Sequence, residues 1–384
     1  MITRDIAYIG VDDTDLDLFE SQYIIPNGIS YNSYLIKDEK IAIMDTADNR
    51  KIDEWLGNLR TALDGRTPDY LVVQHMEPDH AGCIAEILEE YPAIKIVASA
   101  RAIQMMPQFF EGRDFSQNTI AVKEGDTLSL GEHILQFFMA PMVHWPEVMV
   151  TYDKKDKVVF SADGFGKFGA LSHEEDWACE ARRYYFNICG KYGGPVQALL
   201  KKLATLDVEC ICPLHGPILK ENLGYYIGLY DTWSKYDVET EGVFIAYASI
   251  HGGTAAVANV MAEILREKGA KKVSVADLSR DDMAEAIEDA FRMDKMIVAA
   301  ASYDGGVFPV MHDFLHHLQI KAYQKRRVGI IENGSWAPCA GRVMRGMLEQ
   351  MKDVEIAEPM VTILSRMKQS DRAALEALAD AILK

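Results

Sequence analysis

The chain has 384 residues, 49% of them apolar, and a formal net charge of −18. Its length suggests two or three domains, and its acidity argues against nucleic-acid binding, because neutralising phosphates requires clustered Lys and Arg. The first dozen residues lack a secretory apolar segment, no apolar run approaches the ~18 residues that span a bilayer, and the six cysteines form no Cys-x-x-Cys pair. We therefore expect a cytoplasmic protein with reduced thiols.

Residues 1–240 contain many short apolar runs separated by turns, a pattern typical of strands. The predicted strands cover residues 40–48, 69–75, 95–100, 133–141, 147–153, 157–163 and 208–216. A helical pattern over residues 81–91 lies between two of them. Many strands with interspersed helices indicate an α/β sandwich rather than a simple doubly wound sheet.

From residue 243 onward, strands and helices alternate strictly. The apolar runs cover residues 243–249, 271–278, 295–302, 326–334 and 354–364. Each is followed by a helical pattern, the first two over residues 254–268 and 283–291. Five strand–helix pairs predict a doubly wound parallel sheet. The sequence thus predicts two domains, residues 1–240 and 243–384, with the boundary between Asp237 and Gly242.

Four segments of the first domain place a potential metal ligand where a strand ends. Residues 74–82 read QHMEPDHAG directly after an apolar run, and the other segments read PMVHWPE, FSADGFG and CPLHGP. The candidate ligands are His75, Glu77, Asp79, His80, His144, Asp163 and His215. Functional side chains gather at such loop tips on a rigid scaffold.

Ligand counting points to two metal ions. Four imidazoles and three carboxylates give each of two ions four protein contacts if one carboxylate bridges them. Oxygen-rich sites that contain imidazoles and keep open positions suit iron, manganese or zinc. The alternative is that these residues are solvated loop groups or helix caps, as Asp79 could be for the helix that follows it. His133 and His173 lack companions in the sequence, and His316 and His317 fit an amphipathic helix.

The ordered set H-x-E-x-D-H, His, Asp and His resembles the metallo-β-lactamase scaffold, with its usual second histidine replaced by Glu77. With a flavodoxin-like second domain, this variant resembles the flavodiiron proteins over essentially the whole chain, including PNGISYNSYLI and HWPEVMVTY. The resemblance implies an α/β protein with an N-terminal metallo-β-lactamase-like αβ/βα sandwich and a C-terminal flavodoxin-like doubly wound parallel sheet.

The resemblance also implies two iron ions per chain. The first would bind His75, Glu77, His144 and Asp163, and the second would bind Asp79, His80, His215 and the same Asp163 as a bridge. Members of the family differ at the position of His80. Glu77 suits iron on physical grounds as well, because an anionic oxygen donor stabilises the ferric state better than an imidazole does.

The second domain offers a phosphate-binding loop. YASIHGGT places backbone N–H groups, hydroxyls and a helix N-terminus between the first strand and its helix, where they can cradle a phosphate. Two further loops leave the carboxyl ends of later strands, where such sheets bind ligands. By the resemblance these loops bind FMN, through Ser249, His251, Gly252, Gly253, Thr254, Ser302, Tyr303, Asp304, Gly305, Asn333, Gly334, Ser335 and Trp336.

Aromatic side chains in these loops are candidates to flank the flavin ring. Tyr303 and Trp336 can stack on it, and the alternative is that either ring packs on a helix. Family members place the loop aromatic in a glycine-rich stretch, whereas Trp336 here precedes an Ala-Pro-Cys sequence. Tyr192 is a further candidate beside the metal pocket, with a packing role as its alternative.

The resemblance predicts an enzyme that reduces O₂ to water, NO to N₂O, or both, at the diiron centre with electrons relayed through FMN. It implies a head-to-tail homodimer or a dimer of dimers, and a separate electron donor such as a rubredoxin or a reduced deazaflavin. A basic cluster could dock an acidic donor or be a solvated helix end, and comprises Lys321, Lys325, Arg326 and Arg327. Two alternatives stay open: a zinc hydrolase of the metallo-β-lactamase type fused to a flavodoxin electron-carrier module, and a non-catalytic carrier or sensor.

Overall fold

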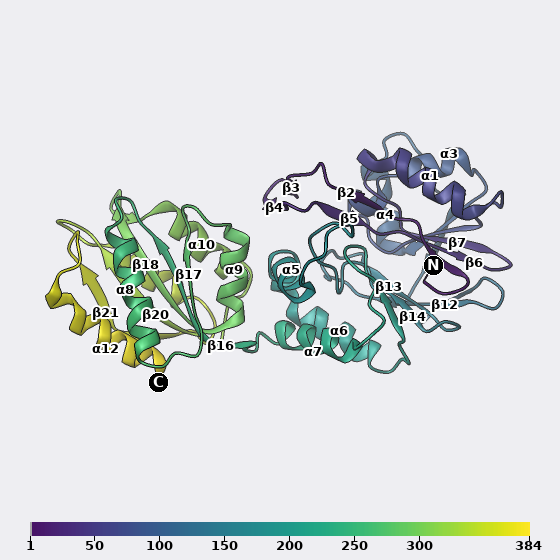
Figure 1. Ribbon diagram of the computed structural model, residues 1–384. Coiled ribbons are helices and arrows are strands. Elements are labelled where there is room, and N and C mark those ends of the chain that lie inside the picture. The colour runs from purple at the N-terminus through teal and green to yellow at the C-terminus, as the bar shows by residue number, and fades with distance from the viewer. Residues whose placement is uncertain (1) are drawn as a thin grey trace. The chain divides into compact units, whose positions relative to one another are not determined.

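The computed structural model describes residues 2–384. The chain divides into two compact units, Met1–Asp231 and Thr232–Lys384 (Figure 1). None of the helices within residues 2–384 is long and apolar enough to cross a membrane.

The division between the units lies a few residues before the boundary that the sequence suggests. It falls inside α7 (Leu223–Ser234), and the segment that follows belongs to the second unit. The reason is a set of hydrogen bonds: the Arg326 guanidinium donates to the carbonyls of Tyr236 and Asp237, at 2.9 and 3.1 Å. A polar linker in the sequence therefore does not mark the edge of the domain, because its backbone is bound by a buried arginine.

The first unit contains two large sheets. The six-stranded sheet comprises, in spatial order, β1 (Ile6–Tyr8), β6 (Tyr34–Lys37), β7 (Ile41–Met44), β8 (Tyr70–Val73), β9 (Lys95–Ser99) and β10 (Thr119–Val122). The five-stranded sheet comprises β11 (Thr127–Ser129), β12 (Ile134–Met139), β13 (Met149–Asp153), β14 (Val158–Phe160) and β15 (Cys210–Cys212). Strands β7 to β10 run parallel, as do β14 and β15, and the remaining neighbours are antiparallel.

One apolar core holds the two sheets together. It is formed by buried side chains from both, including Met44, Val72 and Val97 of the first sheet and Phe137 and Phe160 of the second. Each sheet buries one face against the other sheet and has helices on its opposite face, so the strands read as short, nearly continuous apolar runs in the sequence.

Helices cover the outer faces of this sandwich (Figure 1). They are α1 (Ile52–Leu63), α2 (Pro78–Ala81), α3 (Ile84–Glu90), α4 (Ala100–Phe109), α5 (Trp177–Tyr184), α6 (Gly193–Leu203) and α7. The helix that the sequence predicts over residues 81–91 forms as α3, preceded by the single turn α2. Trp55, Leu59 and Leu63 recur every four residues and form the buried face of α1.

Two short ladders near the N-terminus were not predicted from the sequence. Strand β2 (Val11–Asp13) pairs with β5 (Ile29–Tyr31), and β3 (Leu18–Phe19) pairs with β4 (Tyr23–Ile24). The β3–β4 turn contains Glu20 and Ser21, with φ of 48° and 58°. Two successive residues with positive φ are typical of the tight turns that join two twisted antiparallel strands.

The second unit is a parallel sheet with order β17–β16–β18–β20–β21. Its elements are β16 (Thr240–Ala248), α8 (Gly253–Glu267), β17 (Val273–Asp277), α9 (Met283–Arg292), β18 (Met293–Tyr303), α10 (Pro309–Ile320), β20 (Arg327–Asn333), α11 (Ala340–Leu348), β21 (Glu355–Ile363) and α12 (Arg372–Leu383), with the short β19 (Gly306–Val307) antiparallel to β18. In chain order this is 2-1-3-4-5, the order of flavodoxin-like sheets. Such sheets bind ligands where the strand order reverses, here beside the carboxyl ends of β16 and β18.

Candidate metal centre and phosphate-binding loop

Both sheets of the first unit deliver side chains to one buried site. His75 follows β8, His144 lies between β12 and β13, Asp163 follows β14 and His215 follows β15. Asp79 and His80 come from α2. Ala162, directly before Asp163, has a φ of 50°, a conformation that non-glycine residues adopt mainly at functional or tightly constrained positions.

The first group of candidate ligands consists of His75, Glu77, His144 and Asp163. The Nε2 atoms of His75 and His144 each lie 3.1 Å from Glu77 Oε2. The same two nitrogens lie 3.3 and 2.9 Å from Asp163 Oδ2. Two imidazole nitrogens and two carboxylate oxygens therefore face one point, which is the arrangement that a metal ion requires.

The second group consists of Asp79, His80 and His215. His80 Nε2 and His215 Nε2 each lie 3.3 Å from Asp79 Oδ2. The two nitrogens are only 3.1 Å apart. Neutral ring nitrogens that face each other at this distance repel unless a proton or a metal ion lies between them.

Asp163 connects the two groups. Its Oδ2 faces the first group, while its Oδ1 lies 3.2 Å from His80 Nε2 and 3.7 Å from His215 Nε2. A carboxylate whose two oxygens face different sets of imidazoles has the geometry of a metal bridge. All seven residues that the sequence suggested thus lie in two adjoining groups, and Asp79 does not cap a helix through its side chain.

Several buried atoms of the site lack a hydrogen-bond partner. They are both carboxylate oxygens of Asp79, Oδ1 of Asp163 and Nδ1 of His80. Buried polar atoms are rarely left unpaired, because desolvation without a replacement bond costs ~1–3 kcal/mol each. Metal coordination would supply the missing partners of the carboxylate oxygens, so the donor set fits a pair of cations.

Neighbouring groups fix the orientation of two of the histidine rings. His75 Nδ1 donates to Glu147 Oε1 at 2.8 Å, and His215 Nδ1 donates to the carbonyl of Ser30 at 2.7 Å. Glu147 Oε1 also accepts from the backbone N–H of Met76, at 2.9 Å. A proton held on Nδ1 leaves the lone pair of Nε2 free to bind a metal.

The charges of the site favour a cation. Burial opposes a charge on His75, but Asp163, Glu147 and Glu77 outweigh it and raise the pKa of the ring well above its ordinary value. Burial alone would raise the pKa of Asp163, yet the surrounding histidines, His75 foremost, hold it well below its usual range. The Asp163 carboxylate therefore stays ionised at neutral pH and attracts positive charge into the site.

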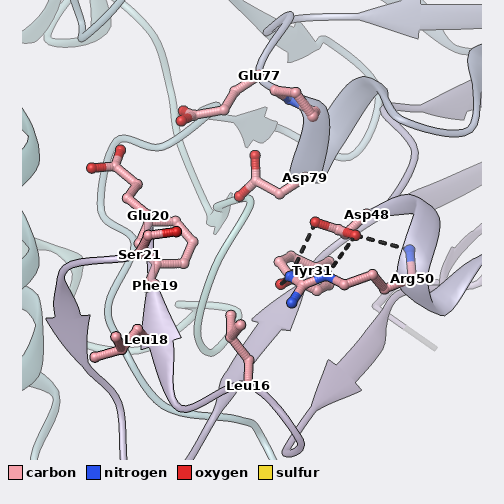
Figure 2. Close-up of a pocket in the computed structure, with 11 residues that line it drawn as sticks. Leu16, Leu18, Phe19, Glu20, Ser21, Tyr31, Asp48, Arg50, Glu77 and Asp79 are labelled. Atoms are coloured by element: carbon pink, nitrogen blue, oxygen red, sulfur yellow. Dashed lines mark hydrogen bonds and ion pairs between the residues drawn. The ribbon is translucent and has the colours of Figure 1, made fainter.

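A cavity of about 250 Å³ adjoins the metal ligands. Figure 2 shows the carboxyl groups of Glu20, Glu77 and Asp79 facing this space. Its other lining residues are Leu16, Leu18, Phe19, Ser21, Tyr31, Asp48, Arg50 and Pro78. The cavity gives a small molecule access to the side of the metal centre on which Glu77 and Asp79 lie.

The second unit brings its three predicted loops to the carboxyl edge of its sheet. The hydroxyl of Ser249, after β16, is buried without a hydrogen-bond partner. Gly252 has a φ of 81°, which strongly favours glycine, and leads into the N-terminus of α8. A buried hydroxyl without a partner beside a helix N-terminus fits a phosphate group.

The loop after β21 also reaches this edge and was missed by sequence reasoning. Asn333 donates to the carbonyl of Ser365 at 2.9 Å and accepts from the Ser365 N–H at 3.0 Å. A Cβ added at Gly253 would lie only 2.4 Å from the same carbonyl. Gly253 therefore lets the first loop pack directly on the last one, a contact that no local sequence pattern reveals.

The two predicted aromatic residues are exposed. Trp336 is 92% exposed, so its ring does not pack on a helix. Tyr303 is 45% exposed and contacts the ring of Phe308 edge-on at 5.6 Å. In the second predicted loop, Ser302 Oγ accepts hydrogen bonds from the N–H groups of Cys339 and Ala340, at 2.8 and 3.0 Å.

Some secondary candidates take structural roles. Arg326 of the basic cluster is buried and donates to the carbonyls of Met293 and Phe291, so it is not a docking residue. His133 does have companions: its Nδ1 lies 3.0 Å from Asp153 Oδ2. Tyr192 is half-buried, and the Lys191 ammonium lies 5.9 Å from its ring centre.

Comparisons with known proteins agree with this architecture. Residues 29–216 match the model of the ODP family beta lactamase. The putative diflavin flavoprotein A 2 of Synechocystis is 30% identical over 376 residues, which cover 96% of this chain and 64% of that protein. The anaerobic nitric oxide reductase flavorubredoxin of Escherichia coli is 28% identical over 88% of this chain and 72% of its own length. The chain thus spans only part of these two relatives.

Solved structures match over almost the full length. The rubredoxin oxygen:oxidoreductase of Desulfovibrio gigas has a TM-score of 0.93 and 26% identity, covering 100% of this chain and 97% of that one. A variant of the flavo di-iron protein of Thermotoga maritima has a TM-score of 0.88 and 25% identity, covering 98% and 95%. The structural neighbours of this chain are flavodiiron proteins. The predicted resemblance to that family is confirmed, as is its fold class of a β-lactamase-like domain and a flavodoxin-like domain.

Proposed function

We propose that this flavodiiron-like chain is an oxidoreductase that reduces O₂, NO or both at a diiron centre, with electrons relayed through FMN. The comparisons support the oxidoreductase class. The observation that carries the proposal is the position of Asp163 between two groups of imidazole and carboxylate ligands. This arrangement suits two metal ions that act on one small substrate.

One iron would bind His75, Glu77, His144 and Asp163, and the other would bind Asp79, His80, His215 and the second oxygen of Asp163. When bound, the irons supply binding positions for the gas and the electrons for its reduction. Three carboxylates among the ligands offset much of the positive charge of two divalent ions, which lowers the cost of burying them. The Nε2 atom of His80 lies as close to Asp79 and Asp163 as that of His215 does. The geometry therefore supports His80 as a ligand of the second iron.

The protein itself holds the ligands and lines the cavity beside them. Glu147 holds the His75 ring with Nε2 directed at the first position, and the Ser30 carbonyl does the same for His215. Leu16, Leu18 and Phe19 form an apolar wall of the adjoining cavity. An apolar wall suits O₂ and NO, which are small molecules without charge.

FMN would bind the second unit. The Ser249 hydroxyl and the N-terminus of α8 would hold its phosphate, and Gly252 and Gly253 allow the close approach. The exposed rings of Tyr303 and Trp336 would flank the flavin ring. FMN supplies one or two electrons at a time when reduced.

The relatives' names suggest both candidate gases and a donor. One is named a nitric oxide reductase and flavorubredoxin, and another a rubredoxin oxygen:oxidoreductase. We therefore propose O₂ or NO as the substrate and a rubredoxin or a reduced deazaflavin as the electron donor. A head-to-tail homodimer, or a dimer of dimers, would let each flavin face the metal centre of its partner.

The test is anaerobic stopped-flow spectroscopy of protein with quantified iron and FMN, which is reduced and then mixed separately with O₂ and NO. Fast reoxidation that depends on iron would support the proposal, and the faster gas would be the preferred substrate. Reoxidation no faster than that of an iron-free preparation would overturn it. Hydrolysis supported by zinc without flavin turnover would favour a zinc hydrolase fused to a flavodoxin module.

A further inference from the structure

The cavity beside the metal centre contains two carboxyl groups that neither proposed metal site uses, those of Asp48 and Glu20. Glu77 and Asp79 belong to the candidate ligands, and Asp48 accepts two hydrogen bonds from the Arg50 side chain, at 3.0 and 3.2 Å. The Oε2 atom of Glu20 accepts a hydrogen bond from the Gln22 amide at 3.2 Å. Its carboxyl group faces the cavity (Figure 2).

The β3–β4 hairpin holds Glu20 in place. Phe19, the residue before it, packs its ring edge-on against His215 at 5.4 Å and against Phe168 at 5.7 Å. On the other strand, the Tyr23 hydroxyl donates to the carbonyl of Asn187 at 3.1 Å. The turn between them is short, so the packing of Phe19 on His215 holds the backbone of Glu20 near the metal centre. Much of that side chain remains exposed to water.

The proposed reaction consumes protons at this cavity. Reduction of O₂ to two waters takes four electrons and four protons, and reduction of two NO to N₂O and water takes two of each. The cavity wall beside the hairpin is apolar, and the hydroxyl of Tyr31 already accepts a hydrogen bond from Arg50 at 2.7 Å. A group that touches both solvent and cavity is therefore needed to move protons inward.

We propose that Glu20 passes protons from solvent into the cavity beside the metal centre. In each step the Glu20 carboxyl gives its proton to an oxygen atom of the substrate that is being reduced, and the resulting carboxylate takes a proton from water. The electrons come from the reduced metal centre and flavin, so this inference rests on the proposed function. Glu20 is thus a proton-donating residue that binds no metal.

The charges around Glu20 are consistent with this role. Loss of hydration on its cavity side and the Glu77 carboxylate raise the pKa of Glu20 to about 7, with a smaller contribution from Asp79, while His144 and the Gln22 amide oppose the rise. An acid whose pKa lies near the working pH is both available as a donor and quickly reprotonated. Bound iron would oppose this rise further.

The test compares three variants of the iron- and FMN-loaded protein. Glu20→Gln keeps the shape of the side chain and removes its titratable carboxyl group. Glu20→Asp keeps a carboxyl group on a side chain that is one methylene shorter. Glu39→Gln is the control, because it removes an exposed carboxylate from another turn of the same unit. We expect Glu20→Gln to lower kcat for gas reduction about 100-fold, the lower end of what positioned proton transfer contributes. Glu20→Asp should recover part of the loss, and Glu39→Gln should behave as the wild type.

A second readout does not depend on turnover. Infrared difference spectra across a pH titration should show a protonated carboxyl band at low pH that disappears as the pH rises, in the wild type and in Glu39→Gln. The band should be missing from Glu20→Gln, whose iron and FMN contents should match those of the wild type. A purely structural role for Glu20 would not produce such a band.

The outcomes separate the two proposals. If the wild type shows no iron-dependent reduction of either gas, the proposed function fails and the role of Glu20 fails with it. If the wild type is active and Glu20→Gln keeps its kcat and pH profile within about twofold, only the role of Glu20 is overturned. Loss of iron from Glu20→Gln would also overturn it, because the residue would then support the metal site instead.

Discussion

The two candidate sites both lie at the ends of parallel strands, yet they are built differently. In the first unit, six of the seven candidate ligands are at most 7% exposed, and several of their polar atoms lack partners. In the second unit, the predicted ring contact Trp336 is 92% exposed and most of the loop is open. A metal centre must be rigid before the ion arrives, whereas a flavin can complete the surface of an open groove with its own large ring. The following predictions test this difference.

The largest effect is expected at the proposed bridge. Asp163→Asn keeps the shape but removes a charge shared by both groups, so both metals should bind more than about 100-fold more weakly, beyond the range for residues that only orient a ligand. Activity should fall with the iron content, while FMN stays bound because it belongs to the other unit. Iron and flavin quantification after purification measures this.

The matched control for this change is Asp207→Asn, since Asp207 is an exposed aspartate that pairs with Lys157. It should keep both irons and full activity. Retention of two irons and normal turnover by Asp163→Asn would contradict the bridging role.

A smaller effect is expected for the group that orients His75. Glu147→Gln weakens the hydrogen bond to Nδ1 and removes a buried charge, so the first metal should bind about 10- to 100-fold more weakly. The second metal, held by a separate group, should be affected less. Metal titration of the apoprotein should therefore show two separated binding steps in the variant, and an unchanged titration curve would reject the orienting role.

On the flavin side the change should be modest. Trp336→Ala removes an exposed ring that is proposed to stack on the flavin, so FMN should bind with about 1 kcal/mol less free energy, or roughly fivefold more weakly. Iron content should not change. The control is Ile320→Ala, another exposed apolar side chain of the same unit, at the end of α10. Fluorescence titration with FMN measures the affinity of the wild type and of both variants. Equal affinities for the three proteins would show that Trp336 does not contact the flavin.

Sequence patterns predicted those parts of the molecule that depend on local periodicity and strand ends. The apolar runs before His75, Asp163 and His215 form strands β8, β14 and β15. Strands β14 and β15 run parallel, so Asp163 and His215 leave the same edge of their sheet. The strict alternation of strands and helices after residue 243 likewise predicted a doubly wound parallel sheet, which the structure has with the order 2-1-3-4-5. In both cases the period of the side chains and the rules for parallel connections suffice.

Contacts between distant segments could not be predicted in this way. Glu147 reaches His75 across 72 positions of sequence, and the hairpin with Glu20 lies far in sequence from every candidate ligand. Ser365 contacts Asn333 only because β20 and β21 are neighbours in the sheet. The companions of His133 were missed for the same reason, since Asp153 lies on the adjacent antiparallel strand β13.

His133 offers a test of folding stability instead of ligand affinity, because it forms a histidine–carboxylate group that can be stabilised by a proton instead of a metal. Its ring is buried, with Nδ1 3.0 Å from Asp153 Oδ2 and Nε2 3.5 Å from Asp5 Oδ2. Burial opposes a charge on the ring, but Asp153 outweighs it and raises the pKa of His133. The stabilisation is therefore complete below the ordinary histidine pKa of ~6.5 and is lost as the pH rises through the raised value.

His133→Gln should lower the free energy of unfolding by about 1–2 kcal/mol at pH 6, and by less at pH 9. Urea unfolding at both pH values measures this, with the exposed His173→Gln as control. An equal loss at the two pH values would mean that His133 stabilises the unit by packing alone.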